Sequence, residues 1–99
     1  MLERFIERTE YDSYKDFKES YHLHYDDDFN FATHVVDAWA EEEPDKLALV
    51  WCDDHGRQRT FTFSQMARLS RQAAGWLRSQ GIGRGDRVMV ILKKHWTYW

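Results

Sequence analysis

Residues 63–80 constrain the fold most, because signals for the start and the end of a helix flank an apolar stripe. At the start, the hydroxyl of Thr62 can reach forward and the side chain of Gln65 can reach back, which makes a capping box. At the end, Gly81 can adopt the left-handed conformation of a Schellman motif. The stripe recurs at helical spacing and consists of Met66, Leu69, Ala73 and Leu77. The pattern predicts a helix that buries this stripe against another layer.

Strands are predicted on both sides of this helix. Before it, apolar runs at 47–51 and 58–61 flank the turn sequence 53–56, which favours a β-hairpin. After it, a glycine turn leads to the apolar run 87–92, which does not alternate with polar residues. Such a run is typical of a parallel strand that is covered on both faces. The order of elements predicts an α/β fold, and the chain stops where the next covering helix should begin. We therefore expect the opening segment of a larger protein.

A further helix is predicted at residues 31–42, upstream of the hairpin. Asn30 is a preferred N-cap residue that can accept from the amide of Thr33 or of a neighbour. Pro44 ends the helix, because the residue before a proline avoids helical dihedral angles. Its apolar face is predicted to contain Phe31, Val35 and Trp39.

Residues 1–30 are predicted to form two short helical pieces and a polar loop. Ser13 and Asp16 make a weak variant of the capping box, since Asp is shorter than the usual Glu. The aromatic residues expected to share one helical face are Tyr14, Phe17 and Tyr21. A helix this short is marginal alone, so these side chains must pack against something else.

Charge and composition exclude several classes of protein. Residues 1–50 hold 14 acidic and 5 basic side chains, a net charge of −9, whereas residues 51–99 hold 3 and 9, a net charge of +6. An overall basic excess with an aromatic platform, which indicates a nucleic-acid-binding protein, is absent. The single cysteine, Cys52, favours a reducing compartment. The sequence has neither a run long enough to span a membrane nor a signal-peptide core, and we expect a cytoplasmic protein.

Two groups of polar residues could carry chemistry. His22 and His24, followed by acidic residues 26–28, could ligate a metal, but no second fixed pair completes a set of four ligands. Cys52 and His55 could form a nucleophile and base, but such a pair also needs an orienting group and an oxyanion hole. We interpret the first group as a solvated acidic loop and the second as a strand end beside a turn.

Two further patterns could contact phosphate. The glycines of 81–85 faintly resemble a dinucleotide fingerprint, but they follow a helix and precede a strand, which is the reverse of the required order. We interpret them as a helix cap and a turn, and the Arg-Gly-Asp sequence at 84–86 as part of that turn. Lys93, Lys94 and His95 follow the end of an expected strand, where ligands of open α/β sheets bind. A solvated basic turn is the interpretation that we favour for them.

From about Tyr11 to Trp99, the sequence resembles the N-terminal end of the AMP-forming acyl-CoA synthetases, a branch of the adenylate-forming ligases. Four stretches in the family's order carry this resemblance: 29–39, typical of the medium-chain branch; 44–50, an entry strand; 61–66, the first core motif L-T-Y-x-E-L; and 73–92, a helix end followed by Gly-Asp-Arg-Val. The departures are Gln65 for Glu, Met66 for Leu, and Lys93-Lys94-His95 where many members have proline.

The resemblance implies that residues 1–30 are an N-terminal helical extension and that 31–99 begin an AMP-binding (adenylation) domain. The full enzyme would use ATP and Mg²⁺ to activate a carboxylic (fatty) acid as an acyl-adenylate, and would transfer the acyl group to CoA. The family's phosphate loop and its C-terminal catalytic lysine are not among these residues. No catalytic, cofactor-binding or metal-binding residue can therefore be assigned here, and we expect the 99-residue chain alone to be inactive.

A different class of function is also compatible with the sequence. A stand-alone α/β interaction module would bind a protein partner through aromatic residues at 11–21 and at Trp96, Tyr98 and Trp99. An open reading frame that continues into a phosphate loop would support the synthetase, and a stop codon would support the module. As part of a synthetase, the chain is expected to pack on the rest of its protein or to self-associate, because it exposes apolar surface.

Overall fold

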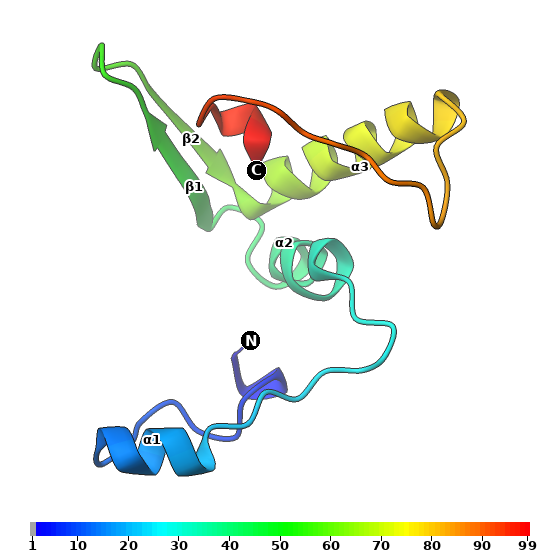
Figure 1. Ribbon diagram of the computed structural model, residues 1–99. Coiled ribbons are helices and arrows are strands. Elements are labelled where there is room, and N and C mark those ends of the chain that lie inside the picture. Colours follow the sequence, from blue (N-terminus) through cyan, green and yellow to red (C-terminus); the bar gives the residue numbers. More distant parts are fainter. Residues whose placement is uncertain (1) are drawn as a thin grey trace.

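The computed structural model describes residues 2–99 and shows a mixed α/β arrangement (Figure 1). The elements in chain order are a 3₁₀ turn η1 (Leu2–Arg4), helix α1 (Tyr14–Ser20), a π-helical turn η2 (Ala32–Asp37), helix α2 (Ala38–Glu42), strands β1 (Leu47–Cys52) and β2 (Gln58–Thr62), helix α3 (Phe63–Ser79) and a 3₁₀ turn η3 (Trp96–Tyr98). The hairpin and α3 lie together, α2 packs beside them, and the N-terminal segment lies on the other side of α2 (Figure 1). The expected α/β fold class is confirmed.

The helix predicted at 31–42 is present as η2 followed by α2. The side chain of Asn30 accepts from the amide of Ala32 at 2.9 Å, so the predicted cap is made with a neighbour and not with Thr33. The helix ends at Glu42, and Glu43, with φ −139° and ψ 73°, has left the helical conformation before Pro44 as expected. The π-helical geometry of the first turns was not predicted, because it leaves the apolar spacing almost unchanged.

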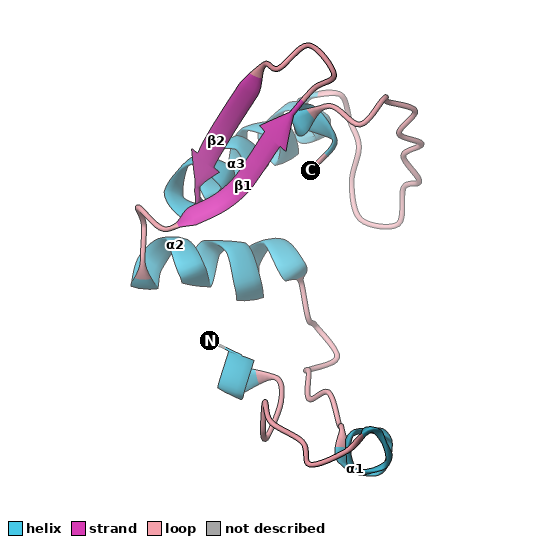
Figure 2. Cartoon of the chain, turned by 90° about the vertical axis from the view of Figure 1, so that its left-hand side faces the viewer, coloured by secondary structure: helices cyan, strands magenta, loops and turns pink. Residues whose placement is uncertain are grey.

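The predicted hairpin is confirmed as the antiparallel pair β1–β2 (Figure 2). Leu49 lies opposite Phe61 and Cys52 lies opposite Gln58, with an irregularity near Leu47. Gly56 adopts a φ of 75° in the turn, which is the left-handed conformation that the sequence predicts there.

Helix α3 begins and ends as predicted. The backbone amide of Thr62 donates to the side chain of Gln65 at 2.9 Å, and the amide of Gln65 donates to the Thr62 hydroxyl at 3.4 Å, which completes the capping box. At the other end, Gly81 has a φ of 82°, and the amide of Ile82 donates to the carbonyl of Leu77 at 3.2 Å. These contacts are those of a Schellman motif.

The core is thinner than the apolar stripe of α3 predicts. Ala67 is the one fully buried hydrophobic residue in the part of the chain that the structure describes. Met66, Leu69 and Leu77 are half-buried, and Ala73 is exposed, so the prediction of a buried stripe is wrong. The physical reason is that, among the helices and strands of residues 2–99, α2, η2 and the hairpin make most of the contacts with α3, and Figure 1 shows them near its first turns.

The predicted parallel strand at 87–92 is also not formed. These residues run back alongside α3 as an extended segment, and their backbone is not paired in a sheet (Figure 1). The only sheet within residues 2–99 has two strands, β1 and β2. A strand exists only through hydrogen bonds to a neighbour, and no neighbour lies beside this segment.

Candidate functional site

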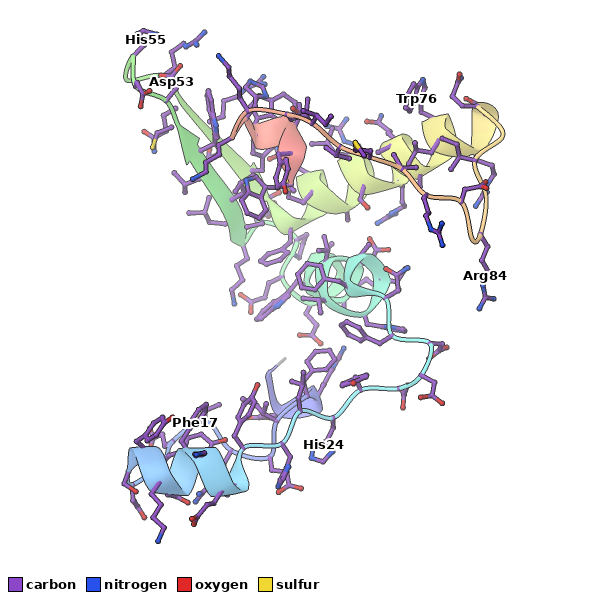
Figure 3. The ribbon with its side chains drawn as sticks, in the orientation of Figure 1. Phe17, His24, Asp53, His55, Trp76 and Arg84 are labelled. Atoms are coloured by element: carbon purple, nitrogen blue, oxygen red, sulfur yellow. The ribbon has the colours of Figure 1, made fainter. Side chains whose placement is uncertain are left out.

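The histidines and acids of the N-terminal loop are spread along an exposed surface. His24 lies with its Nε2 atom 3.3 Å from a carboxylate oxygen of Glu7, and both side chains are exposed (Figure 3). Among residues 2–99, no three His, Cys, Asp or Glu side chains are close enough to hold a metal ion. The region lines an open, mainly polar pocket, in agreement with a solvated acidic loop.

Cys52 and His55 lie at the hairpin turn, but Asp53 organises that turn. The carboxylate of Asp53 accepts from the amide of His55 at 3.0 Å, from the amide of Arg57 at 2.8 Å and from the Arg57 guanidinium at 2.6 Å. Loss of hydration raises the pKa of Asp53, but hydrogen bonds from Arg57 and His55 outweigh it and lower the pKa below its ordinary value. Cys52 is exposed and its thiol makes no hydrogen bond within the described residues, so the geometry supports a structural turn.

The glycines of 81–85 are a helix cap followed by a turn, as interpreted from the sequence. The amide of Gly83 donates to the carboxylate of Asp86 at 2.7 Å, and Gly85 has a φ of 92°. Arg84 points away from the molecule at this turn (Figure 3). The turn follows the C-terminal end of α3, whose dipole is negative, and therefore does not favour phosphate.

The basic residues at 93–95 are anchored on the hairpin by an aromatic cluster, which consists of Trp51, Arg59, Phe61, His95 and Trp96. The indole N–H of Trp51 donates to the carbonyl of Lys94 at 2.9 Å, and its ring lies 5.0 Å from the ring of His95. Phe61 lies 5.1 Å from Trp96, and the guanidinium of Arg59 lies 4.7 Å from the Trp96 ring. The cluster fixes the C-terminal tail, residues 93–99, to the hairpin. The sequence alone did not predict these contacts.

An apolar groove of about 630 Å³ lies between the tail and α3. The face of α3 that carries Met66, Leu69 and Leu77 forms one wall, and Trp96 to Trp99 form the other. Trp99 is 74% exposed, and Trp76 lies outside the groove and points away from α3 (Figure 3). The groove can bind an apolar surface; its polar lining side chains are Ser70, Gln72, Thr97 and Tyr98, and none of them is a carboxylate, an amine, an imidazole or a thiol.

A second apolar pocket, of about 430 Å³, lies between the N-terminal segment and the helix at 31–42. Its walls are aromatic and aliphatic and include Phe5, Tyr25, Phe29, Val35 and Trp39. Phe29 contacts Phe5 and Tyr25 edge-on, with ring centroids 5.7 and 6.3 Å apart. These ring contacts lie within the N-terminal segment, and the polar side-chain groups in the lining of the pocket include the hydroxyls of Tyr21 and Tyr25.

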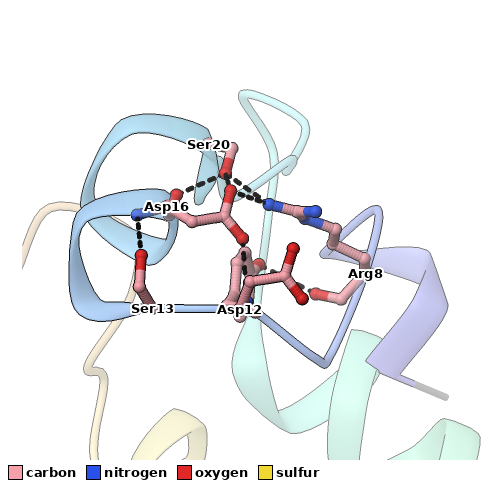
Figure 4. A network of polar contacts seen from close by, with 6 residues as sticks. Arg8, Asp12, Ser13, Asp16 and Ser20 are labelled. Carbon is pink, nitrogen blue, oxygen red and sulfur yellow. Dashed lines mark hydrogen bonds and ion pairs between the residues drawn. The ribbon is translucent and has the colours of Figure 1, made fainter.

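The N-terminal segment is organised by a polar network around Asp16 (Figure 4). The hydroxyl of Ser13 accepts from the amide of Asp16 at 3.1 Å, as predicted, but the Asp16 carboxylate accepts from the amide of Asp12 and not of Ser13. Arg8 pairs with the same carboxylate, and Ser20 donates to it at 2.8 Å. Hydrogen bonds from Ser20 and Asp12, with the charge of Arg8, lower the pKa of Asp16.

The aromatic face predicted for helix α1 is only partly formed. Phe17, labelled in Figure 3, contacts Tyr21 and Tyr11 with ring centroids 5.0 and 5.1 Å apart. Tyr14 is largely exposed. Arg8 and Asp16 lie eight residues apart, and this spacing is not part of a periodic pattern or of a known motif. The sequence therefore held no signal for this network.

Comparison with known proteins identifies relatives over most of the chain. The family model described as "AMP-binding enzyme" matches residues 36–99. The acyl-coenzyme A synthetase ACSM3, mitochondrial, of Rattus norvegicus is 33% identical over 95 residues, which cover 90% of this chain and 16% of that protein. ACSM4, mitochondrial, of Homo sapiens is 38% identical over 77 residues, 72% of this chain and 13% of that protein.

A bacterial protein matches about two thirds of the chain. The propionate–CoA ligase of Escherichia coli (strain K12) is 39% identical over 64 residues, which cover 64% of this chain and 10% of that protein. The chain thus spans 16% or less of the length of these relatives. None of the helices in residues 2–99 is both long enough and apolar enough to cross a membrane.

Proposed function

The chain belongs to the AMP-binding enzyme family, and we propose that the protein it comes from is an AMP-forming acyl-CoA synthetase, an acid–thiol ligase. The observation that carries the proposal is the family match over 36–99, which includes the helix, hairpin, α3 and tail described above. The relatives named as acyl-CoA synthetases and as propionate–CoA ligase support the same class of reaction. The division at residue 31, between an extension and the adenylation domain, stays a prediction.

The proposed reaction has two steps. A carboxylic acid attacks the α-phosphorus of ATP, which forms an acyl-adenylate and releases pyrophosphate. The thiol of CoA then attacks the acyl carbon, and AMP leaves. Adenylation is needed because a carboxylate is a poor electrophile, and such a reaction depends on groups that offset phosphate charge.

The residues described here do not fit ATP or Mg²⁺. The glycine turn at 81–85 follows a helix C-terminus, and Lys93 and Lys94 are exposed without a cradle of backbone amides. Within residues 2–99, no cluster of carboxylates could hold a metal ion. We therefore assign no step of the reaction to this chain and propose that its role is scaffolding: the capped α3 and the hairpin support a sheet that carries the chemistry.

The test of the proposed function uses the full-length protein with ATP, CoA and a panel of carboxylic acids from propionate to long-chain fatty acids. We expect AMP to form only when both an acid and CoA are present. Release of ADP, or no acid-dependent AMP with any member of the panel, would contradict the proposal. The panel also identifies the acyl chain length.

The scaffolding role is tested separately with the 99-residue chain. We expect no exchange of labelled pyrophosphate into ATP with any acid that the full-length protein uses. Measurable exchange by the purified chain would show that it carries part of the chemistry. The cytoplasmic location remains a proposal that rests on the lone cysteine, whereas two of the relatives are named as mitochondrial.

A second candidate function is a stand-alone interaction module. The exposed aromatic side chains at the tail, which include Tyr98 and Trp99, favour it. The same assays separate the two functions, because a module would show no acid-dependent AMP formation in its full-length form.

A further inference from the structure

The first turn of the helix at 31–42 is closed by a reciprocal pair of hydrogen bonds between Asn30 and His34. The side chain of Asn30 accepts from the amide of Ala32 at 2.9 Å, and Nδ1 of the His34 ring accepts from the amide of Asn30 at 2.9 Å. Phe31 already has helical dihedral angles, φ −56° and ψ −39°, so Asn30 stands at the cap position. The pattern is that of a capping box in which an imidazole, one position later, replaces the usual Glu or Gln side chain.

The bond from Asn30 to His34 exists only while the ring is neutral. A ring nitrogen accepts an N–H bond only when it carries no proton, so the proton of neutral His34 lies on Nε2. Protonation of Nδ1 would bring two donors face to face and would put a positive charge at the positive end of the helix dipole. Histidine is the side chain that ordinarily changes its charge between about pH 5 and about pH 8. The capping box of α3 returns its bond through Gln65 and has no such dependence.

Carboxylates lie in the same open pocket as His34. The other charged or titratable side chains that line this pocket are Arg4, His24, Asp26 and Asp27. The two basic members have partners elsewhere, since Arg4 pairs with Glu42 and Nε2 of His24 lies 3.3 Å from a carboxylate oxygen of Glu7. The acidic loop at 26–28 therefore offers protonated His34 a partner that neutral His34 does not use.

The groups on the other sides of His34 do not compete with this loop. Asp37 is the first carboxylate after His34 in the helix, and it pairs with Arg71 of α3 at 3.2 Å. The ring of Phe29 stacks on His34 with centroids 5.6 Å apart and an interplanar angle of 30°. An aromatic face within about 6 Å also attracts a cation, so Phe29 keeps the imidazole beside the loop in both charge states.

We propose that His34 is a proton-sensitive switch at the start of this helix: neutral His34 caps the helix through the amide of Asn30, and protonated His34 leaves the cap and pairs with the carboxylates of the loop at 26–28. The cap stabilises the helix while His34 is neutral, and this stabilisation is lost as the pH falls and the ring takes up a proton. The change reaches the N-terminal segment, because Phe29 also contacts Phe5 and Tyr25. The switch uses no group of the proposed ligase reaction and is independent of it.

Hydrogen exchange of the full-length protein tests the switch at about pH 7.5 and at about pH 5.5. The rates at the amides of Asn30 and Ala32 are divided by those of an unstructured peptide at the same pH, which gives protection factors free of the intrinsic pH effect. We expect protection at both amides to fall about fivefold at the lower pH, which corresponds to the loss of one helix cap. The amides of β1 serve as the internal reference and should keep their protection.

Two substitutions of His34 separate the cap from its titration. His34→Asn places an acceptor oxygen at the same number of bonds from Cβ as Nδ1, but it does not titrate in this range. We expect this variant to keep the protection of the wild type at neutral pH, and to keep it at both pH values. His34→Ala has no acceptor and should show the lower protection at both. Circular dichroism of each full-length variant shows that it is folded.

The matched control is His24→Gln, which removes the other histidine of the pocket and leaves the cap intact (Figure 3). The fall in protection should remain in this variant. Asp26→Asn combined with Asp27→Asn should move the midpoint of the fall to lower pH, because carboxylates favour the protonated ring. Any of four results would overturn the proposal: unchanged protection in the wild type, a fall that persists in His34→Asn, a fall that His24→Gln removes, or a midpoint that the two Asp substitutions leave in place.

Discussion

Asp53 holds the hairpin turn through three donors, which are the amides of His55 and Arg57 and the guanidinium of Arg57. The composition of the segment 53–56 predicts a turn, but it does not show which of the two adjacent aspartates organises it. Only the position of each carboxylate relative to the chain decides this, and that position depends on the register of the hairpin. The network of Asp16 with Arg8 was missed because the two residues lie eight positions apart, a spacing that matches no local motif.

The lowered pKa of Asp53 makes the hairpin sensitive to acid. Because the folded-state pKa lies below the ordinary value of 3.8, ionised Asp53 stabilises the turn at higher pH, and this stabilisation is lost as the pH falls below that value. We predict that Asp53→Asn weakens the hairpin at neutral pH and removes this part of its pH dependence. The chemical shifts of β1 and β2, followed from about pH 6 to about pH 2, measure the effect.

Asp54→Asn is the matched control for this prediction. Its side chain makes no hydrogen bond or ion pair within residues 2–99, so the pH dependence of the hairpin should remain. Equal effects of the two substitutions would show that net charge, and not the turn geometry, causes the acid sensitivity.

At the scale of elements, the features that depend on local interactions were predicted best from the sequence. The ends of α3 were both predicted, because the Thr62–Gln65 box and Gly81 act within a few residues. The hairpin was predicted from two short apolar runs and a turn. The segment 87–92 was predicted wrongly as a strand, since pairing depends on a partner that a local pattern does not reveal. The same holds for the candidate site. Its turns and caps were predicted from local sequence, whereas the aromatic cluster on the hairpin, which joins distant residues, was not.

The capping box should have a measurable effect on the stability of α3. Thr62→Ala removes the acceptor for the amide of Gln65, and we predict a loss of about 1 kcal/mol in the free energy of unfolding. Gln65→Glu should be neutral or slightly stabilising, because a carboxylate still accepts from Thr62 and favours the positive end of the helix. Thermal unfolding followed by circular dichroism tests both, and a destabilising Gln65→Glu would contradict the model of the cap.

Two glycines of the same region should respond in opposite ways to alanine. Gly81 has a φ of 82°, and Gly81→Ala should cost about 1–2 kcal/mol because a Cβ atom disfavours this conformation. Gly75 lies within α3, with no atom within 4 Å of a Cβ built on it, so Gly75→Ala should stabilise the helix by about 0.5–1 kcal/mol. The midpoints of thermal unfolding give both values, and the same sign for both substitutions would contradict the assignment of Gly81 as the cap.

At the scale of the whole molecule, the chain has many local interactions and little shared core. Only Ala67 is fully buried among the hydrophobic residues that the structure describes, and large apolar side chains remain exposed from Phe17 to Trp99. Stable domains of this size bury more apolar surface. The family match covers 36–99, and the relatives extend well beyond the aligned part, so the exposed face of α3 is where we expect further packing in the full-length protein.

The scaffolding role leads to a prediction for the full-length enzyme. Within residues 2–99, the hydroxyl of Thr62 contacts only the amide of Gln65 and the hydroxyl of Ser64, at the start of α3. Because these contacts are those of a helix cap, Thr62→Ala should lower the melting temperature but leave kcat and KM of the folded enzyme nearly unchanged. Turnover is measured well below both melting temperatures, with the folded fraction determined by circular dichroism at the same temperature. Gln65→Glu, which keeps the capping box, should change neither quantity appreciably. Loss of adenylation at an unchanged melting temperature would place this motif in the chemistry, since a cap that only stabilises a helix acts on the folded fraction and not on the transition state.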